Sequence, residues 1–518
     1  MTMDVTTEPE EATYRFGPLE RAGFMLGLRI PQLVGFILAG LVALGFLNAG
    51  GVRGLLSAIA VMALAAAILV VPIHGHTLEE WAPLTVRFLA GRCSRQTRFR
   101  AQLAAVGHLV DVPDGGLEPQ PPGEPKSLPK ELVGVEYLEG RLAEYDGTPF
   151  GVVVDRKAKT MTAVLRCQGQ AFTLLGSLDR ERRLAGYGGV LAALARDDTP
   201  LRRIAWTERT LPANRDALAT YLLEHKRADA TLDEPPDELA SYLQLIGRVT
   251  DVAEDHELLF SVQIDTQRMA SRRAIKRLGG GDLGAIAVLA EELGQVADLL
   301  DGAGISVTGV LTRRGVSAAV RNAYDPWGRR QRERADADGI AAMTAGPMAR
   351  DETWSHIATD GALHATLWVA EWPRIDVRAM FLQPLLSSSR TTRTVTMVME
   401  LVGPGKGIRR VERAATEAAT NQSMRDRIGQ RTTQRDAQKE QATARREYEL
   451  AKGHAEVRFA AFVTVSTPAG AGAVAELESA VSRVETEAKR APLRLERMWG
   501  QQAEAFTYAA LPLCRGLR

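Results

Sequence analysis

Two uncharged apolar runs stand near the start of the chain, separated by a short glycine-rich turn. The first covers Leu33 to Leu47, and the second covers Gly54 to Val71 with Ser57 as its only hydroxyl residue. A helix needs roughly 17–25 apolar residues to cross the hydrocarbon core of a bilayer. The second run has this length, and the first reaches it when the small and polar residues at its ends lie in the interfaces. The pattern therefore predicts a transmembrane helical hairpin over residues 31–71.

The charges that flank the two runs indicate an orientation. Arginines before and after the hairpin outnumber the single Arg53 of the turn: Arg21, Arg29, Arg87, Arg92, Arg95, Arg98 and Arg100. An excess of Lys and Arg in short flanking segments marks the cytoplasmic side. We therefore expect a cytoplasmic (inner) membrane protein with two spans and both termini in the cytosol. A signal peptide has one shorter run and a cleavage site, which disfavours that alternative, whereas a buried hairpin of a soluble protein stays open.

The segments on either side of the hairpin are expected to lie at the membrane surface. Residues 1–30 form a polar cytosolic tail, and residues 72–110 form an amphipathic juxtamembrane segment. Within this segment a helix is expected to begin after Thr77, which is its N-cap. The predicted membrane-interface residues of this segment are Trp81, Arg87, Arg92 and Arg95, because indole rings and basic side chains suit the headgroup level. Packing of the same helix on the soluble part of the chain is an equally weighted alternative.

The remaining sequence predicts an α+β fold in the cytosol. Residues 111–132 are rich in proline and glycine, which predicts an extended, semi-rigid linker. Residues 133–324 alternate strand-like and helix-like patterns, as an α/β domain does. Residues 325–350 form a charged loop, and residues 351–518 form a second α+β subdomain with a long charged helix over residues 407–452. That helix has few large aliphatic residues, so it is interpreted as a solvated connector or as an arm that contacts a partner.

Within these units, short alternating runs predict the individual strands. Strands are expected at Phe150 to Asp155, Thr160 to Cys167, Leu201 to Thr210, Glu257 to Ile264, Ile305 to Leu311, Leu363 to Glu371, Arg378 to Phe381, Thr391 to Val402, Val457 to Val465 and Leu493 to Met498. Helices are expected at 179–194, 212–225, 267–278, 282–301 and 472–489. Gly279 to Gly281 should separate two of these helices, with Asp282 as the next N-cap.

Composition and charge exclude some classes of protein. The chain has 518 residues, which is too long for one hydrophobic core, and its net charge is +1. This balance argues against direct, sequence-specific nucleic-acid binding, which usually uses a strongly basic domain. The three cysteines, Cys93, Cys167 and Cys514, are scattered without CxxC spacing. They predict neither a disulfide framework nor a zinc site.

No catalytic constellation is recognisable in the sequence. Gly403 to Gly407 lacks the distant glycine and the hydroxyl residue of a phosphate-binding loop. Gly279 to Gly284 matches GxGxxG literally, but the expected preceding element is a helix and not the strand that a dinucleotide site needs. His74 and His76 have no third ligand nearby in the sequence. We therefore expect no catalytic residues, no metal and no cofactor.

Three stretches carry a resemblance to a known family. FGVVVDRKAKTMTAVLRCQGQAFTLL from Phe150, LAEELGQVADLLDGAGISVTGVL from Leu289 and AFTYAALPL from Ala505 resemble the N-terminal domain of conjugation-type ATPases of type IV secretion systems. The hairpin with its lead-in from Tyr14 resembles the PrgI-like two-helix membrane subunits of the same machines, and actinobacterial mobile elements carry proteins of this shape. Because the Walker motifs are missing, the resemblance implies a membrane platform that docks a separate ATPase, and no catalytic role.

The expected function is that of a membrane-anchored scaffold subunit of a conjugation-like transfer complex. Its partners would be the lipid bilayer, the secretion ATPase and other membrane subunits, in a homo- or hetero-oligomer. The hairpin is expected to associate laterally, because small residues allow close approach of membrane helices. The predicted helix-packing positions are Gly35, Gly40 and Gly45 in the first helix, with Ala60, Ala63 and Ala67 in the second. A membrane component of a type VII secretion apparatus and a membrane-tethered enzyme with an unrecognised site are the alternatives.

Overall fold

The fold is known from a computed structural model, which describes most of the chain. The described residues are 16, 30–48, 50–70, 77–101, 109–111, 117–119, 128–142, 146–169, 174–212, 254–329, 345–386, 391–403 and 456–517, with single residues at 241, 244, 405, 407, 444 and 448. Nearly all of the predicted helix 407–452 lies outside these residues, and so does the predicted helix 212–225 after Pro212. His74, His76 and much of the charged loop 325–350 lie outside them as well.

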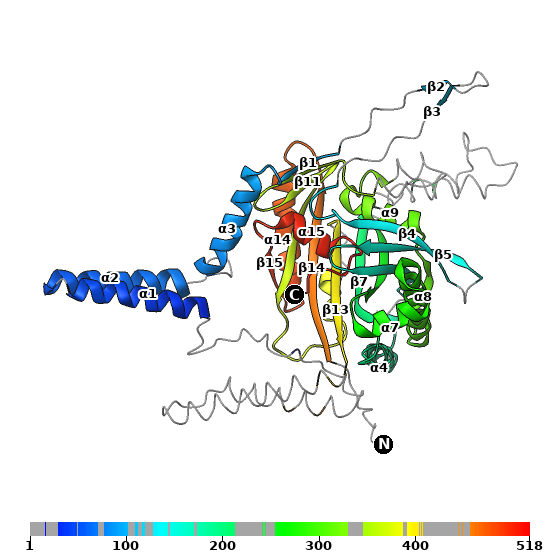
Figure 1. The fold of residues 1–518 in the computed structure, drawn as a ribbon, viewed down its shortest axis with the longest axis horizontal. Helices are drawn as coiled ribbons and strands as arrows, with labels where there is room; N and C mark the ends of the chain where they lie inside the picture. Colours follow the sequence, from blue (N-terminus) through cyan, green and yellow to red (C-terminus); the bar gives the residue numbers. More distant parts are fainter. Residues whose placement is uncertain are drawn as a thin grey trace.

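One large open antiparallel sheet organises the described part of the chain (Figure 1). Its main path runs β1 (Arg98–Arg100), β10 (Ala349–Glu352), β11 (Ile357–Thr359), β12 (Ala362–Glu371), β14 (Glu456–Pro468), β13 (Arg393–Val402), β7 (Leu201–Pro212), β8 (Glu254–Asp265), β6 (Thr160–Gln168), β5 (Thr148–Asp155) and β4 (Val135–Leu142). Two further strands, β15 (Arg494–Arg497) and β9 (Ser306–Val310), pair with β12 and β6. The mixed α and β content agrees with the predicted fold class.

The sheet continues across the predicted boundary between the two cytosolic units. β7, from the first unit, pairs with β13, from the second, over seven register positions from Arg203 opposite Glu400 to Arg209 opposite Thr394. The fully buried Arg209 of the first unit also crosses this boundary, because its guanidinium donates to the Ala510 carbonyl oxygen of the second unit at 3.0 Å. We therefore describe residues 133–324 and 351–517 together as one body.

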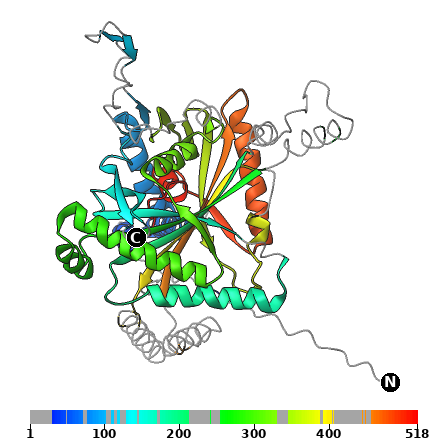
Figure 2. The ribbon, with the colours of Figure 1, turned by 90° about the vertical axis from the view of Figure 1, so that its right-hand side faces the viewer.

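Helices cover both faces of the sheet. α4 (Ser177–Leu194), α7 (Met269–Arg277), α8 (Gly281–Gly302), α11 (Gln383–Leu386) and α14 (Ala473–Arg490) contribute to the cores on one face, and α9 (Arg313–Tyr324) and α15 (Gln502–Ala509) contribute to those on the other. The long helices α4 and α8 are seen lying across one face in Figure 2. The alternation of side chains along a strand explains both cores, since Ala163 and Leu165 of β6 face one core and Val164 faces the other.

A pair of helices projects from this body (Figure 1). α1 (Ile30–Asn48) and α2 (Gly51–Val70) pack against each other along their length, joined by a connection in which Gly50 and Gly51 have positive φ. Of the described helices, α2 alone is long and apolar enough to cross a membrane, and Gln32–Asn48 of α1 is a shorter apolar segment. By length and composition, the described residues thus contain one candidate membrane span and one shorter apolar helix.

The predicted helix-packing positions concern lateral association, which stays a prediction, but their places relative to the seam between α1 and α2 differ. Gly35 lies in it, because a Cβ atom there would sit 2.8 Å from Leu69 Cδ1, whereas nothing lies within 4 Å of such an atom at Gly40 or Gly45. The seam also uses Gly54, where a Cβ atom would meet the Phe46 carbonyl oxygen at 2.4 Å. Gly40 and Gly45 thus face away from the α1–α2 contact.

Most predicted strands are confirmed, and three local predictions are wrong. Arg378 to Phe381 forms a turn before α11 instead of a strand. Gly280, and not Asp282, is the N-cap of α8; its φ of 74° suits glycine, and Asp282 in the first turn binds Arg156. The linker ends earlier than predicted, because Leu132 is only 2% exposed, and β2 (Leu109–Asp111) pairs with β3 (Leu117–Pro119) at its start.

Candidate functional site

The candidate site is a cleft of about 510 Å³ between the helix that follows the α1–α2 pair and the C-terminal part of the body. That helix, α3 (Leu78–Cys93), begins at the predicted N-cap Thr77, whose backbone N–H donates to the Glu80 carboxylate at 3.1 Å. The cleft is lined by α3, the segment at Lys130, the β5–β6 turn, and residues 500–517. α3 and the C-terminal residues of the body therefore meet at this cleft.

Aromatic rings hold α3 against the body. Trp81 stacks on Trp354 with ring centroids 5.7 Å apart and an interplanar angle of 29°. Phe88 meets the same ring edge to face, at 5.1 Å and 80°. Both geometries are favourable for aromatic pairs. Trp354 lies in the turn between β10 and β11, so one indole ring connects α3 to the sheet.

The predicted membrane-interface residues divide into two pairs. Trp81 and Arg87 face the body, since Trp81 stacks on Trp354 and Arg87 forms an ion pair with Glu504 of α15. Arg92 and Arg95 are exposed at the end of α3. For Trp81 and Arg87 the structure favours the alternative in which this helix packs on the soluble part of the chain. The sequence missed Trp354 and Glu504, because neither stands in a motif.

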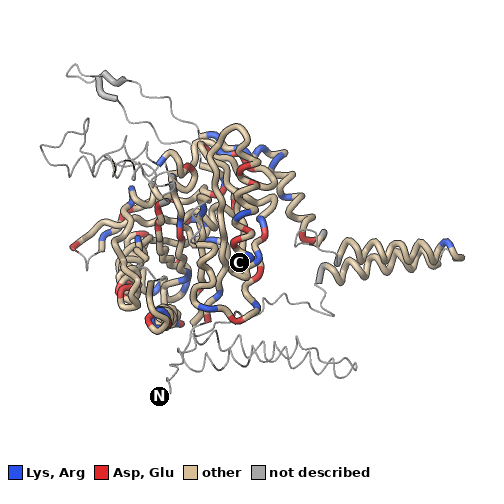
Figure 3. Tube along the Cα trace, turned by 180° about the vertical axis from the view of Figure 1, so that it is seen from behind, with Lys and Arg blue, Asp and Glu red and all other residues tan. Residues whose placement is uncertain are grey.

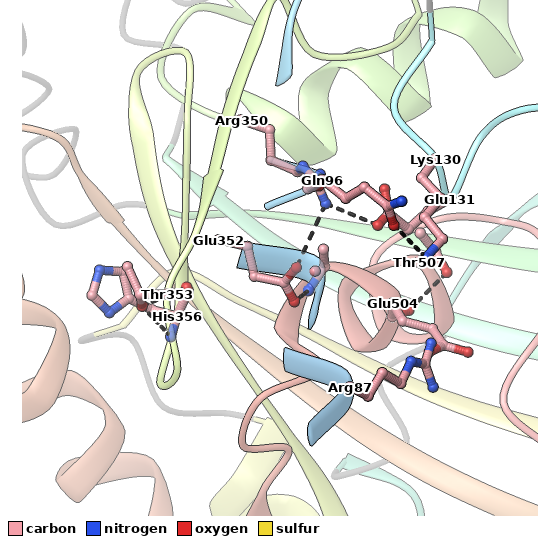
Figure 4. A network of polar contacts seen from close by, with 12 residues as sticks. Arg87, Gln96, Lys130, Glu131, Arg350, Glu352, Thr353, His356, Glu504 and Thr507 are labelled. Carbon is pink, nitrogen blue, oxygen red and sulfur yellow. Dashed lines mark hydrogen bonds and ion pairs between the residues drawn. The ribbon is translucent and has the colours of Figure 1, made fainter. Parts of the chain in front are cut away.

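A buried ionic network lies beneath this contact (Figure 4). The Arg350 side chain is 3% exposed and donates to the Glu131 carboxylate at 2.9 Å and to the Gln96 carbonyl at 2.7 Å. It also lies 3.9 Å from Glu352 on the same strand. Arg350 therefore joins β10 to the end of α3 on one side and to the start of the body on the other.

Glu352 links this network to the N-terminus of α15. Its carboxylate accepts the backbone N–H of Ala503 at 2.9 Å, where a helix favours negative charge. Burial raises the pKa of Glu352 above its ordinary value, while the Ala503 N–H and Arg350 oppose this shift. The carboxylate is thus held as a structural acceptor at the base of the cleft.

The C-terminal segment is fixed along the cleft by side chains of the sheet. Arg203 donates to the carbonyl oxygens of Cys514 and Leu517 at 3.3 and 2.6 Å, and Gln263 donates to that of Leu513 at 2.9 Å. Arg515 forms an ion pair with Asp155, the last residue of β5. Residues 513–517 are therefore packed on the body and line one side of the cleft.

The cleft has the volume of a ligand pocket, but its charges are largely paired with one another. The ion pairs Arg87–Glu504, Arg350–Glu131 and Arg515–Asp155 account for three of its carboxylates, and Glu352 accepts from α15. Within the described residues, no group of three or more His, Cys, Asp or Glu side chains is placed to hold a metal. The arrangement is suited to holding α3 in a fixed position.

The sequence matches no protein-family model, and it has no significant match among curated proteins.

Gly500 is the residue that allows Trp354 to reach α3, which leads to a first prediction. Gly500 has a φ of 68°, and a Cβ atom there would lie 2.5 Å from Cζ3 of Trp354. We expect Gly500→Ala to displace the indole and to weaken the α3 contact by about 1–2 kcal/mol. The equilibrium constant for detachment of α3 from the body should then rise by a factor of roughly 5–30. Amide hydrogen exchange of residues 78–93 should accelerate by this factor.

The matched control is Gly472→Ala. Gly472 has a similar φ of 78°, but nothing lies within 4 Å of a Cβ atom at this position. This substitution introduces the same backbone strain without the contact to Trp354, so exchange in α3 should not change. Equal exchange of α3 in both variants would contradict the role assigned to Trp354.

Proposed function

We propose that the chain is a membrane-anchored scaffold subunit whose α1–α2 pair spans the cytoplasmic membrane. The observation that carries the proposal is the apolar surface of this pair. Fifteen of its large hydrophobic side chains are 38–74% exposed: Val34, Ile37, Leu38, Leu41, Val42, Leu44, Phe46, Leu47, Val52, Leu55, Leu56, Ile59, Met62, Leu64 and Ile68. A contiguous exposed surface of this kind marks a membrane or interaction site.

Length and charge support the same proposal. α1 has 19 residues and α2 has 20, so each helix is about 28–30 Å long, close to the thickness of the hydrocarbon core. Arg53 is the only charged residue of the pair, and Figure 3 shows the basic position at the end farthest from the body. With the basic residues of α3 and β1 on the body side, both termini would be cytosolic.

The scaffold role rests on the way α3 is attached to the body. The ring contacts and ion pairs of the cleft fix the helix after α2 to the sheet, so the body would keep a defined orientation under the membrane. Gly40 and Gly45 leave a small-residue surface on α1 that suits lateral association with a neighbouring helix. We propose that the body docks a separate transfer ATPase, as the resemblance to conjugation-type proteins implies. A type VII apparatus is the runner-up.

Cysteine labelling in intact cells tests the membrane topology. The native Cys93 is exposed, whereas Cys167 and Cys514 are buried. A membrane-impermeant maleimide should label Val52→Cys in intact cells and should label Cys93 only after lysis. Labelling of Cys93 in intact cells would overturn the orientation, and recovery of the chain in the soluble fraction would overturn the anchor.

Co-purification and ATP turnover test the scaffold role. The detergent-purified chain should show no ATP hydrolysis alone and should bring down a motor ATPase from native membranes. The cleft of about 510 Å³ is in the size range of small-molecule sites, which favours a tethered enzyme as the second candidate function. Turnover by the isolated chain would support that second candidate.

A further inference from the structure

Three aromatic rings form a pocket at one edge of the body. Trp372 follows β12, Phe381 lies in the turn before α11, and Phe459 lies on β14. Trp372 and Phe459 meet edge to face with centroids 5.0 Å apart and an interplanar angle of 84°. Trp372 and Phe381 also pack against the core beneath α14, so the pocket is continuous with the hydrophobic interior.

The occupant of this pocket is a residue of the N-terminal segment. The Phe16 ring stacks on Trp372 at 5.0 Å and 29°, and it contacts Phe381 at 5.4 Å and Phe459 at 6.2 Å. All three centroid distances fall within the range of attractive aromatic pairs. Phe16 therefore enters a pocket built from three separate elements of the body, as an anchor residue enters a recognition site.

The rings of this pocket are only partly buried in the body. Phe459 is 37% exposed even with Phe16 in contact. The connection favours occupation by the same chain, since only 13 residues separate Phe16 from Ile30, the first residue of α1. A short tether gives an effective concentration in the millimolar range, so a few ring contacts suffice.

We propose that Trp372, Phe381 and Phe459 form a docking pocket for Phe16 of the chain's own N-terminal segment. The tether from Phe16 to Ile30 can extend over at most about 50 Å, so the docked ring limits how far the start of α1 can move from the body. The α1–α2 pair is then attached at both ends, through Phe16 before α1 and through α3 after α2. This inference does not depend on membrane insertion.

Photo-crosslinking of the full chain in detergent tests the pocket. With p-benzoylphenylalanine in place of Phe16, irradiation should crosslink residue 16 to peptides that contain Trp372 or Phe459. Trp372→Ala should lower the yield about tenfold, the equivalent of losing one ring pair. Trp372→Phe keeps an aromatic ring and should retain most of the crosslink, which separates loss of the pocket from loss of the fold. Trp327→Ala removes a tryptophan elsewhere and should leave the yield unchanged.

Mixed isotope labelling distinguishes the source of the occupant. Crosslinks within one chain support the proposal. Crosslinks between heavy and light chains would overturn it and would assign the pocket to exchange between copies. A yield that does not depend on Trp372 would overturn it as well. Because the experiment is done in detergent, its failure leaves the test of the membrane anchor unaffected.

Discussion

A chain that carries Leu41→Arg and Ile59→Arg is expected to be lost from the membrane fraction. Both residues lie near the middle of their helices and are 61% and 57% exposed. An arginine at the centre of a membrane helix costs about 2.5–3.5 kcal/mol, so the two substitutions together oppose insertion by about 5–7 kcal/mol. Extraction of membranes at alkaline pH, followed by immunoblotting, measures the retained fraction.

The control adds the same two charges to the body. Leu283 on α8 and Val474 on α14 are 83% and 50% exposed, so Leu283→Arg with Val474→Arg should leave membrane retention as it is in the parent chain. If both double variants were retained equally, the exposed surface of α1 and α2 would not be lipid-facing. The proposed anchor would then be wrong, although the fold of the body would be unaffected.

Replacement of Arg350 by methionine is expected to cause the largest loss of stability in the body. The guanidinium is buried and pairs with Glu131, so its removal leaves a carboxylate of the network without its cation. Breaking a buried pair on one side typically costs about 3–5 kcal/mol. The urea midpoint of the detergent-solubilised chain, followed by circular dichroism, should fall accordingly.

An exposed ion pair provides the comparison for Arg350. The Arg374 side chain is 72% exposed and pairs with Glu371 three residues before it. Arg374→Met should change the stability by less than about 0.5 kcal/mol, because water already solvates both charges. Arg350→Lys retains the charge but not the forked geometry of the guanidinium. Its urea midpoint should lie between those of Arg350→Met and Arg374→Met. A midpoint for Arg350→Met close to that of Arg374→Met would contradict the importance of the network.

Local patterns were enough to predict most of the elements. Alternation of apolar and polar residues predicted β5 and β6. The polar residues between them form a turn, in which two backbone N–H groups donate to Asp155. The helix N-cap at Thr77 is likewise confirmed. These features depend on residues close together in sequence, where propensity and turn chemistry decide the outcome.

The order of strands and the residues of the cleft could not be predicted in this way. Arg87 and Glu504 are 417 residues apart, and neither side chain carries a local sign of its partner. The same holds for Trp81, whose indole suits a membrane interface and an aromatic contact equally well. Arg378 to Phe381 was predicted as a strand but forms a turn. A short run without clear alternation therefore does not distinguish a strand from a turn.

The pairing of β1 with β10 has a consequence for biosynthesis. Arg100 lies 250 residues before Arg350, the residue whose carbonyl it reaches across this strand pair. At translation rates of about 5–20 residues per second, the nascent β1 waits roughly 12–50 s for its partner strand to leave the ribosome. During this interval α1 and α2 have already emerged, so the membrane insertion proposed for them would precede closure of the sheet.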